Sequence, residues 1–319
     1  MLNRISAALL GFAAFTTSAT AGVCQSENLM PEYFAFAEAT KTLPLEARAG
    51  HFVSDFAAKH PDYYTSEFGG EQQLREAAKV LLDPAHPAQI PGFAPLTDER
   101  LRSVDAAMAG AFATAQQRFS ETFADFRCET KVSFGPSLMH FDGSGGKDAG
   151  GHWHMRFGVD MIALLHGPED MPAFLAHELF HVYHHDLLGT AMPADESLVW
   201  WQMWEEGLAT YVSKRLTPGV SEQQVFWFPA DIVERMKVPG AMRDAARLML
   251  ADFDKSSMTA KEWFQMKYSA PGLPERAGYY VGYRMAAELG HTHTLAELAR
   301  MQPAEIKARA QAFLTAEAR

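Results

Sequence analysis

A five-residue segment, His177 to His181, has residue types and spacing that could bind a metal ion. Its two histidines are four residues apart, and Glu178 directly follows the first of them. No glycine or proline interrupts the chain from residue 173 to residue 188, so we expect the segment to lie within a helix. Four residues turn an α-helix by about 400°, so both imidazoles would project from one face and could bind the same ion. The segment therefore predicts a Zn²⁺ site, with Glu178 placed to take a proton from water that zinc has acidified to a pKa of ~7.

The third ligand of such a site has to come from elsewhere in the chain. Catalytic zinc ions usually have three protein ligands and one water molecule. A third histidine six residues after His181 would complete one such set, but Leu187 occupies that position. His185 is on the same helix face one turn further along, where we expect it to contact solvent or a ligand residue. The alternative is a carboxylate on a following helix, and Glu206 is 25 residues beyond His181 (206 − 181 = 25), with Glu205 directly before it.

The segment around these glutamates also suggests how two helices could meet. A loop containing Gly189 and Pro193 would end the histidine-bearing helix and let a second helix return beside it. Gly207 and Ala209 are small, so we expect them to allow the second helix to approach the first closely.

The segment from Trp204 to Tyr211 reads W-x-E-G-x-A-x-Y, and together with H-E-x-x-H it resembles the gluzincin group of zinc peptidases. It is most similar to a bacterial family of zinc-dependent proteases known mainly as a domain of unknown function, over roughly residues 130–290. The resemblance implies that Glu206 is the third zinc ligand, and Glu205, about 100° away around the helix, is the alternative. Thr210 departs from the better-known gluzincins, in which a carboxylate often supports a metal-bound histidine. The group that orients the histidines therefore stays open.

A second stretch near the end of the chain carries the same resemblance. Residues 278–284 match the family pattern G-Y-x-x-G-Y at the start of a late helix. The match implies that Tyr279 donates a hydrogen bond to the oxyanion formed when water attacks a carbonyl group. Tyr280, Tyr283 and Arg284 are weaker candidates, because tyrosines at helical spacing are more often core residues.

The elements that must position these residues indicate an α+β fold that is mainly helical. Apolar residues at helical or alternating spacing, and clusters of proline or glycine, mark its parts. In chain order they predict helices over Pro31–Asp125 with a loop over Asp83–Pro95, strands over Lys131–Phe134 and His154–Val159 with a flexible loop over 142–151 between them, and helices from Pro172 to Arg319. The resemblance implies a zincin-like core with a small sheet, preceded by a helical region. We expect a signal peptide (1–21), a helical N-terminal region (22–129) and a zincin-like domain (130–319).

The second predicted strand has a further implied role. It occupies the place where zincins carry the edge strand that pairs with an extended substrate. His152 and His154 alternate onto one face of it, and we expect both to be solvated.

Composition and cysteine usage limit the possible partners and compartment. A basic residue, an apolar run and Ala19-Thr20-Ala21 predict an export signal that is cleaved after Ala21, which leaves 27 basic and 39 acidic residues, or −12. This balance argues against binding to nucleic acid or an anionic membrane, and no later segment is apolar enough to span a bilayer. Cys24 and Cys128 are an even pair in an exported chain, so we expect a disulfide and a periplasmic or secreted protein.

These features together predict a zinc-dependent peptidase, a hydrolase that acts on peptides or proteins with Glu178 as general base. One alternative is a zincin-fold protein that binds a partner without cleaving it. Another is a hydrolase of a non-peptide amide. The sequence indicates neither the cleavage preference nor the oligomeric state.

Overall fold

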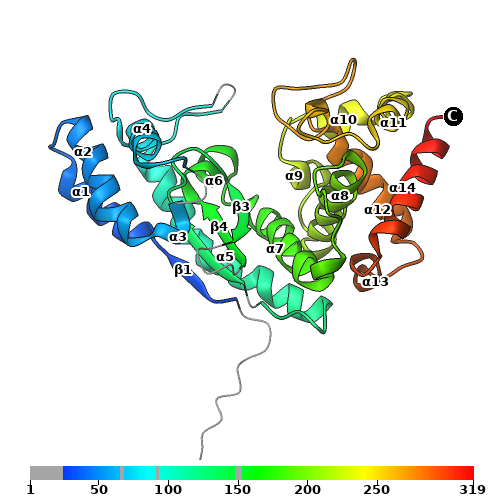
Figure 1. Ribbon diagram of the computed structural model, residues 1–319, viewed down its shortest axis with the longest axis horizontal. Helices are drawn as coiled ribbons and strands as arrows, with labels where there is room; N and C mark the ends of the chain where they lie inside the picture. The colour runs from blue at the N-terminus through cyan, green and yellow to red at the C-terminus, as the bar shows by residue number, and fades with distance from the viewer. Residues whose placement is uncertain (1–23, 65–67, 91–92, 129, 148–152) are drawn as a thin grey trace, which may run out of the picture.

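The computed structural model describes residues 24–64, 68–90, 93–128, 130–147 and 153–319. The predicted signal segment and His152 lie outside the described residues. The described chain forms one small sheet with helices on both sides of it (Figure 1), which confirms the mainly helical α+β class.

The sheet is mixed and has the strand order β1-β2-β4-β3. Its parallel strands β1, β2 and β4 pair side by side, and β3 pairs antiparallel with β4. Phe134 of β2 and Phe157 of β4 stack with ring centroids 5.2 Å apart, and Phe174 packs edge-on against Phe157, with centroids 6.0 Å apart. The four strands are β1 (Ser26–Asn28), β2 (Lys131–Gly135), β3 (Gly143–Lys147) and β4 (Trp153–Gly158).

Two predictions about the sheet were wrong. Residues 143–147, expected in a flexible loop, form β3, because the free edge of β4 supplies partners for their backbone groups. The turn before β3 is held by the buried Asp160 carboxylate, which accepts hydrogen bonds from the backbone N–H groups of Ser137 (2.6 Å) and Met139 (2.8 Å). The strand expected at the edge, β4, is therefore an interior strand, and β3 lies at the sheet edge beside it, with β1 at the opposite edge.

The N-terminal residues form helices around one side of the sheet, as the apolar spacing predicted (Figure 1). The predicted loop from Asp83 to Pro95 is confirmed, since no helix or strand occurs among its described residues. Thr97 caps the long helix α5 by accepting a hydrogen bond from the backbone N–H of Arg100. These helices are α1 (Met30–Thr40), α2 (Leu45–His51), α3 (Pro61–Tyr64), α4 (Glu71–Leu82) and α5 (Asp98–Thr122), with the shorter turns η1 (Phe52–Phe56) and η2 (Ala57–Lys59).

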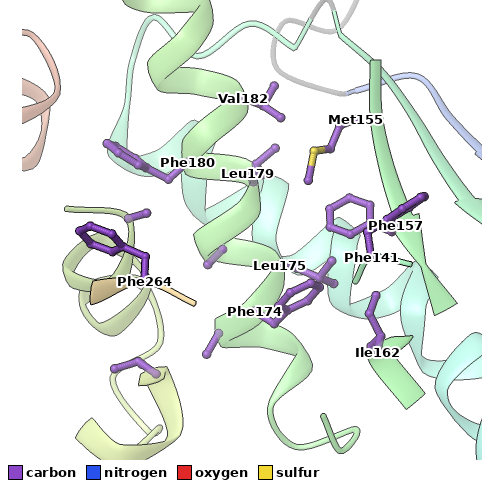
Figure 2. Close-up of a cluster of buried hydrophobic side chains, with 14 of the residues drawn as sticks. Phe141, Met155, Phe157, Ile162, Phe174, Leu175, Leu179, Phe180, Val182 and Phe264 are labelled. Atoms are coloured by element: carbon purple, nitrogen blue, oxygen red, sulfur yellow. The ribbon is translucent and has the colours of Figure 1, made fainter. Parts of the chain in front are cut away.

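The histidine-bearing segment lies inside α7, as predicted, between the sheet and the remaining helices (Figure 1). Leu175 and Leu179 project from α7 into the buried cluster beside the sheet, and Phe180 is buried as well (Figure 2). Gly189, with φ of 49°, ends the helix. The helices that follow β4 are α6 (Val159–Leu165), α7 (Met171–Leu188), α8 (Val199–Leu216), α9 (Glu222–Phe226), α10 (Ile232–Met236), α11 (Ala241–Asp252), α12 (Ala277–Leu289), α13 (Leu295–Ala299) and α14 (Pro303–Glu317), with the short turns η3 (Gly189–Ala191) and η4 (Lys261–Trp263).

Gly207 permits a different helix contact from the one predicted. A Cβ atom on Gly207 would lie 2.1 Å from the backbone carbon of Gly282, and one on Gly282 would lie 1.8 Å from the carbonyl oxygen of Met203. Gly207 therefore lets α8 approach α12, and not the histidine-bearing helix. The two glycine-containing patterns of the sequence meet at this one contact, which fixes α12 beside α8.

Replacing Gly282 by alanine is expected to destabilise the fold by about 1–3 kcal/mol or more, because the added methyl group would overlap backbone atoms. Urea unfolding would measure the change. Gly110→Ala is a matched control at an exposed position of α5, where nothing lies within 4 Å of the added atom, and a gain of about 0.5–1 kcal/mol is expected. Equal stability of Gly282→Ala and the unmodified chain would contradict this helix contact.

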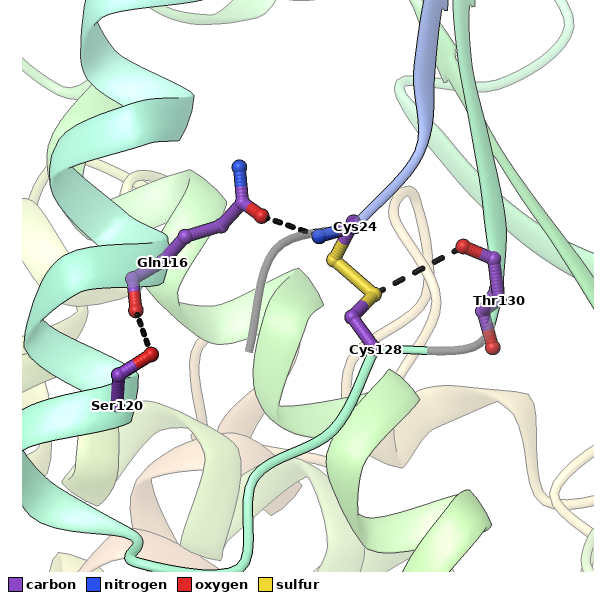
Figure 3. Close-up of a disulfide and its surroundings, with 5 residues drawn as sticks. All are labelled: Cys24, Gln116, Ser120, Cys128 and Thr130. Atoms are coloured by element: carbon purple, nitrogen blue, oxygen red, sulfur yellow. Dashed lines mark hydrogen bonds between the residues drawn. A yellow bond between two sulfur atoms is a disulfide. The ribbon is translucent and has the colours of Figure 1, made fainter. Parts of the chain in front are cut away.

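The predicted disulfide between Cys24 and Cys128 is present (Figure 3). It joins the residue just before β1 to the segment just before β2, across a sequence separation of 104. The backbone N–H of Cys24 also donates a hydrogen bond to the side chain of Gln116 in α5 (2.6 Å). Closing so long a loop stabilises a fold by about 3–5 kcal/mol in the chain-entropy treatment.

The N-terminal residues are tied closely to the rest of the chain. They supply β1 to the sheet, and α5 packs against α7. The boundary near residue 130 stays a prediction. Among the residues that the structure describes, no helix is both long and apolar enough to cross a membrane.

Candidate metal centre

The side chains of His177, His181 and Glu206 meet between α7 and α8. The two Nε2 atoms are 3.1 Å apart, and Oε2 of Glu206 is 3.2 Å from Nε2 of His177 and 3.5 Å from Nε2 of His181. A tetrahedral zinc ion with ligands at 2.0–2.1 Å separates its ligand atoms by about 3.3–3.4 Å. The three atoms therefore have the spacing of one face of a zinc coordination tetrahedron.

The electrostatics of this group also suit a cation. Burial lowers the pKa of His177 to about 4. Burial alone would raise the pKa of Glu206, but His181 and His177 hold it well below its ordinary value. Burial opposes protonation of His181 too, yet the Glu206 carboxylate raises its pKa to about 10. Since zinc binds neutral imidazole and ionised carboxylate, only His181 has to release a proton when a metal ion binds.

Glu205 is close to the same histidine but on its other side. Oε1 of Glu205 is 4.0 Å from Nδ1 of His181, whereas Glu206 approaches Nε2. This geometry favours Glu206 over Glu205 as the ligand and places Glu205 where a carboxylate can orient the imidazole. Thr210 donates its hydroxyl to the backbone carbonyl of Glu206 (2.8 Å) and so does not orient a histidine. Nδ1 of His177 has no hydrogen-bond partner among the described residues.

Glu178 projects from α7 toward the edge strand. A Cβ atom added to Gly143 of β3 would lie 2.7 Å from Oε2 of Glu178, so the absence of a side chain at Gly143 makes room for this carboxylate. Burial raises the pKa of Glu178 to about 8. A carboxylate whose pKa is near neutrality is suited to accept a proton from water and to return it.

The aromatic residues of the second sequence pattern occupy different places. The ring of Tyr279 lies parallel to that of His177, with centroids 6.3 Å apart, at the wall of a cleft. Tyr280 is fully buried against Phe226 in the core. Tyr283 and Arg284 line no part of this cleft either, and Arg284 is exposed. The structure therefore brings only Tyr279 of these candidates to the histidines.

The cleft has a volume of about 440 Å³, and β3, β4, α7, α8 and the start of α12 form its walls. Sequence reasoning missed several residues that line it. Trp227 packs edge-on against His177, with centroids 5.3 Å apart, and nothing in its sequence context indicates this. Asp142 faces the cleft and pairs with His166 (3.2 Å). Arg276 precedes the matched tyrosine pattern by two residues, and this proximity could have drawn attention to it.

The remaining histidines near the motif lie outside the group. His154, predicted to be solvated, is 2% exposed and shares a hydrogen bond with the hydroxyl of Ser133 (2.8 Å), because β4 is an interior strand. His185, one turn beyond His181, accepts a hydrogen bond from the indole N–H of Trp153. Neither residue joins the three candidate ligands.

Comparison with known proteins agrees with this geometry. A family model described as "Putative zinc dependent peptidase (DUF5700)" matches residues 139–302, just over half of the chain. The matched region contains the two histidines, Glu178, Glu206 and Tyr279. Searches of curated proteins and of solved structures found no match. The chain therefore belongs to the DUF5700 family.

Proposed function

We propose that the chain is a zinc-dependent peptidase in which His177, His181 and Glu206 hold Zn²⁺ and Glu178 is the general base. The observation that carries this proposal is the spacing of the three candidate ligand atoms, 3.1–3.5 Å, on two packed helices. Membership of a family described as zinc-dependent peptidases supports a peptide or protein as the substrate.

Each residue of the cleft has a separate role in the proposed hydrolysis. A zinc ion held here would polarise the scissile carbonyl group and acidify a water molecule. Glu178 accepts the proton of the attacking water and then passes it to the leaving amine. The Tyr279 hydroxyl donates a hydrogen bond to the oxyanion of the tetrahedral intermediate. Glu205 attracts the Nδ1 side of His181 electrostatically, from a distance of 4.0 Å.

The edge strand β3 is the surface on which we expect the substrate backbone to lie. Gly143 and Gly145 line the cleft, and their lack of side chains lets another backbone approach closely. An extended peptide that adds to such an edge gains main-chain hydrogen bonds. This role, predicted for β4, falls instead to the strand beside Glu178.

Replacing Gly143 by alanine is expected to lower kcat by about 10–100-fold with zinc content unchanged. The new methyl group would overlap the Glu178 carboxylate and move it, and misplacing a reacting group by about 1 Å can cost 10²-fold. Steady-state kinetics and elemental analysis would measure the two quantities. Gly110→Ala, whose added atom has nothing within 4 Å and lies outside the cleft, is the control. An equal loss in both variants would argue against displacement of Glu178.

Zinc analysis combined with digestion of a mixed peptide library tests the proposal. We expect one zinc ion per chain, and cleavage that a chelator abolishes and added zinc restores. Stoichiometric zinc without cleavage of any peptide would favour a binding protein or a hydrolase of another amide. Absence of stoichiometric zinc would overturn the proposal.

The compartment is proposed from the disulfide. Such bonds persist in oxidising surroundings, so Cys24–Cys128 favours a periplasmic or secreted protein. The net charge of −11 agrees with a partner other than nucleic acid.

A further inference from the structure

Arg276 is a buried cation in the wall of the cleft. The arginine is 6% exposed, and its guanidinium carbon lies 4.0 Å from the ring centroid of Tyr279 and 4.4 Å from that of Phe228. Nη1 donates hydrogen bonds to the backbone carbonyls of Phe226 and Phe228, both at 3.1 Å. The guanidinium plane is thus fixed by two aromatic rings and two carbonyl groups.

Arg276 forms no close ion pair with a carboxylate of the described residues, although its charge interacts with the Glu178 carboxylate at longer range. Both backbone carbonyl groups that accept hydrogen bonds from Arg276 contact Nη1. The edge formed by Nε and Nη2 has the geometry that binds a carboxylate through two parallel hydrogen bonds. The Tyr279 side chain also interacts with the guanidinium, so an incoming carboxylate would share this cation with Tyr279. A buried charge without a close ion pair is costly, and a rigid guanidinium of this kind at a cleft is suited to an anionic group that arrives from outside.

The backbone conformation of Arg276 also indicates a ligand-binding position. Its φ of 57° lies in the left-handed region, which a residue with a side chain adopts at a cost. Arg276 is the residue just before α12, so this conformation is held where the chain enters the helix that carries Tyr279. Strained conformations of this kind persist at ligand-binding positions, where surrounding contacts enforce them.

The rest of the cleft would repel an anion. Apart from Arg276 and histidines, the charged residues that line it are all acidic, among the described residues: Asp142, Glu178, Glu196, Glu205 and Glu206. Away from the proposed zinc ion, an anionic group on a substrate is therefore favoured beside Arg276.

We propose that Arg276 binds a carboxylate group of the peptide substrate through the guanidinium edge formed by Nε and Nη2. The inference rests on the proposed function, since it takes the occupant of the cleft to be a peptide. The carboxylate could be the C-terminus of the peptide or the side chain of an aspartate or glutamate, and these two sources can be separated by experiment.

The test measures peptide binding to the zinc-loaded Glu178→Gln protein by calorimetry, so that turnover does not interfere. Two matched pairs are compared: one peptide as free acid and as C-terminal amide, and one amidated peptide with glutamate or with glutamine at each position in turn. We expect a carboxylate to tighten binding by about 10–100-fold in one pair, as for a charge-assisted bidentate pair. Adding Arg276→Gln should reduce this preference to less than about twofold.

Arg276→Gln also removes the hydrogen bonds to Phe226 and Phe228, so its general effect on the fold needs a control. Arg48→Gln is matched, because Arg48 is similarly buried and donates to a backbone carbonyl, that of Leu82, but lies outside the cleft. The ratio of affinities for acid and amide should be unchanged in Arg48→Gln. A merely structural role of Arg276 would lower both affinities together and leave that ratio intact.

The outcomes separate the two claims. A preference for the free acid that depends on Arg276 assigns the C-terminal carboxylate, and a preference for glutamate assigns a side chain. Three results would overturn the inference: equal binding within both peptide pairs, a carboxylate preference that persists in Arg276→Gln, or no binding of any peptide. Peptide hydrolysis without a carboxylate preference would contradict the role of Arg276 and leave the proposed peptidase function supported. Carboxylate-dependent binding without hydrolysis by the unmodified protein would contradict the peptidase function and still support the binding site at Arg276.

Discussion

The Glu178→Gln protein is expected to retain one zinc ion per chain and to hydrolyse peptides about 10²–10⁴-fold more slowly than the unmodified protein. Glutamine has nearly the same shape as glutamate but cannot accept a proton from water. The side chain contributes no candidate ligand atom, so metal content should not change. Measurement of kcat beside elemental analysis of the same sample would separate the two effects.

The control for this prediction is a glutamate from the same part of the chain without access to the centre. Glu169 is exposed in the loop before α7, and Glu169→Gln is expected to change kcat by less than about twofold. Full activity of Glu178→Gln would eliminate Glu178 as the base. Loss of zinc from that variant would show instead that Glu178 has a part in binding the metal.

Replacing Glu206 by alanine is expected to weaken zinc binding by more than 100-fold. The variant removes one of three ligand atoms and leaves two imidazoles that must hold the ion alone. Glu205→Ala is the matched variant on the same helix, and a residue that only orients a ligand typically contributes about 10–100-fold. Competition with a chelating dye would measure both affinities. A larger loss in Glu205→Ala than in Glu206→Ala would exchange the roles of the two glutamates.

The helices that carry the centre could be predicted because their evidence is local. An uninterrupted helical segment fixes the relation between His177 and His181 whatever the rest of the fold. The choice between Glu205 and Glu206 is different, because it depends on how α8 is rotated against α7. Apolar spacing does not fix that rotation, and only the resemblance favoured Glu206.

The sheet edge could not be predicted from local patterns. Glycine has little preference for a strand, so residues 143–147 carry the composition of a loop, and only their pairing with β4 makes them a strand. Which strand lies at the edge is decided by pairing between distant segments. The same reason explains the error at Gly207, whose neighbour Gly282 is 75 residues away (282 − 207 = 75).

The role of Arg276 could not be predicted from the sequence, for a different reason. A single arginine in a loop before a helix carries no periodic signal, and its environment is assembled from residues 226–228 and Tyr279. That this buried cation forms no close ion pair with a described carboxylate becomes known only from the folded structure. Residues of this kind are found from burial and charge in the folded chain.

The central claim is that one zinc ion lies between α7 and α8, and anomalous diffraction recorded on either side of the zinc absorption edge tests it most directly. The account predicts a single strong peak per chain, within bonding distance of Nε2 of His177, Nε2 of His181 and a carboxylate oxygen of Glu206. A peak bound by other side chains, or crystals grown with zinc that show no peak between these helices, would contradict it.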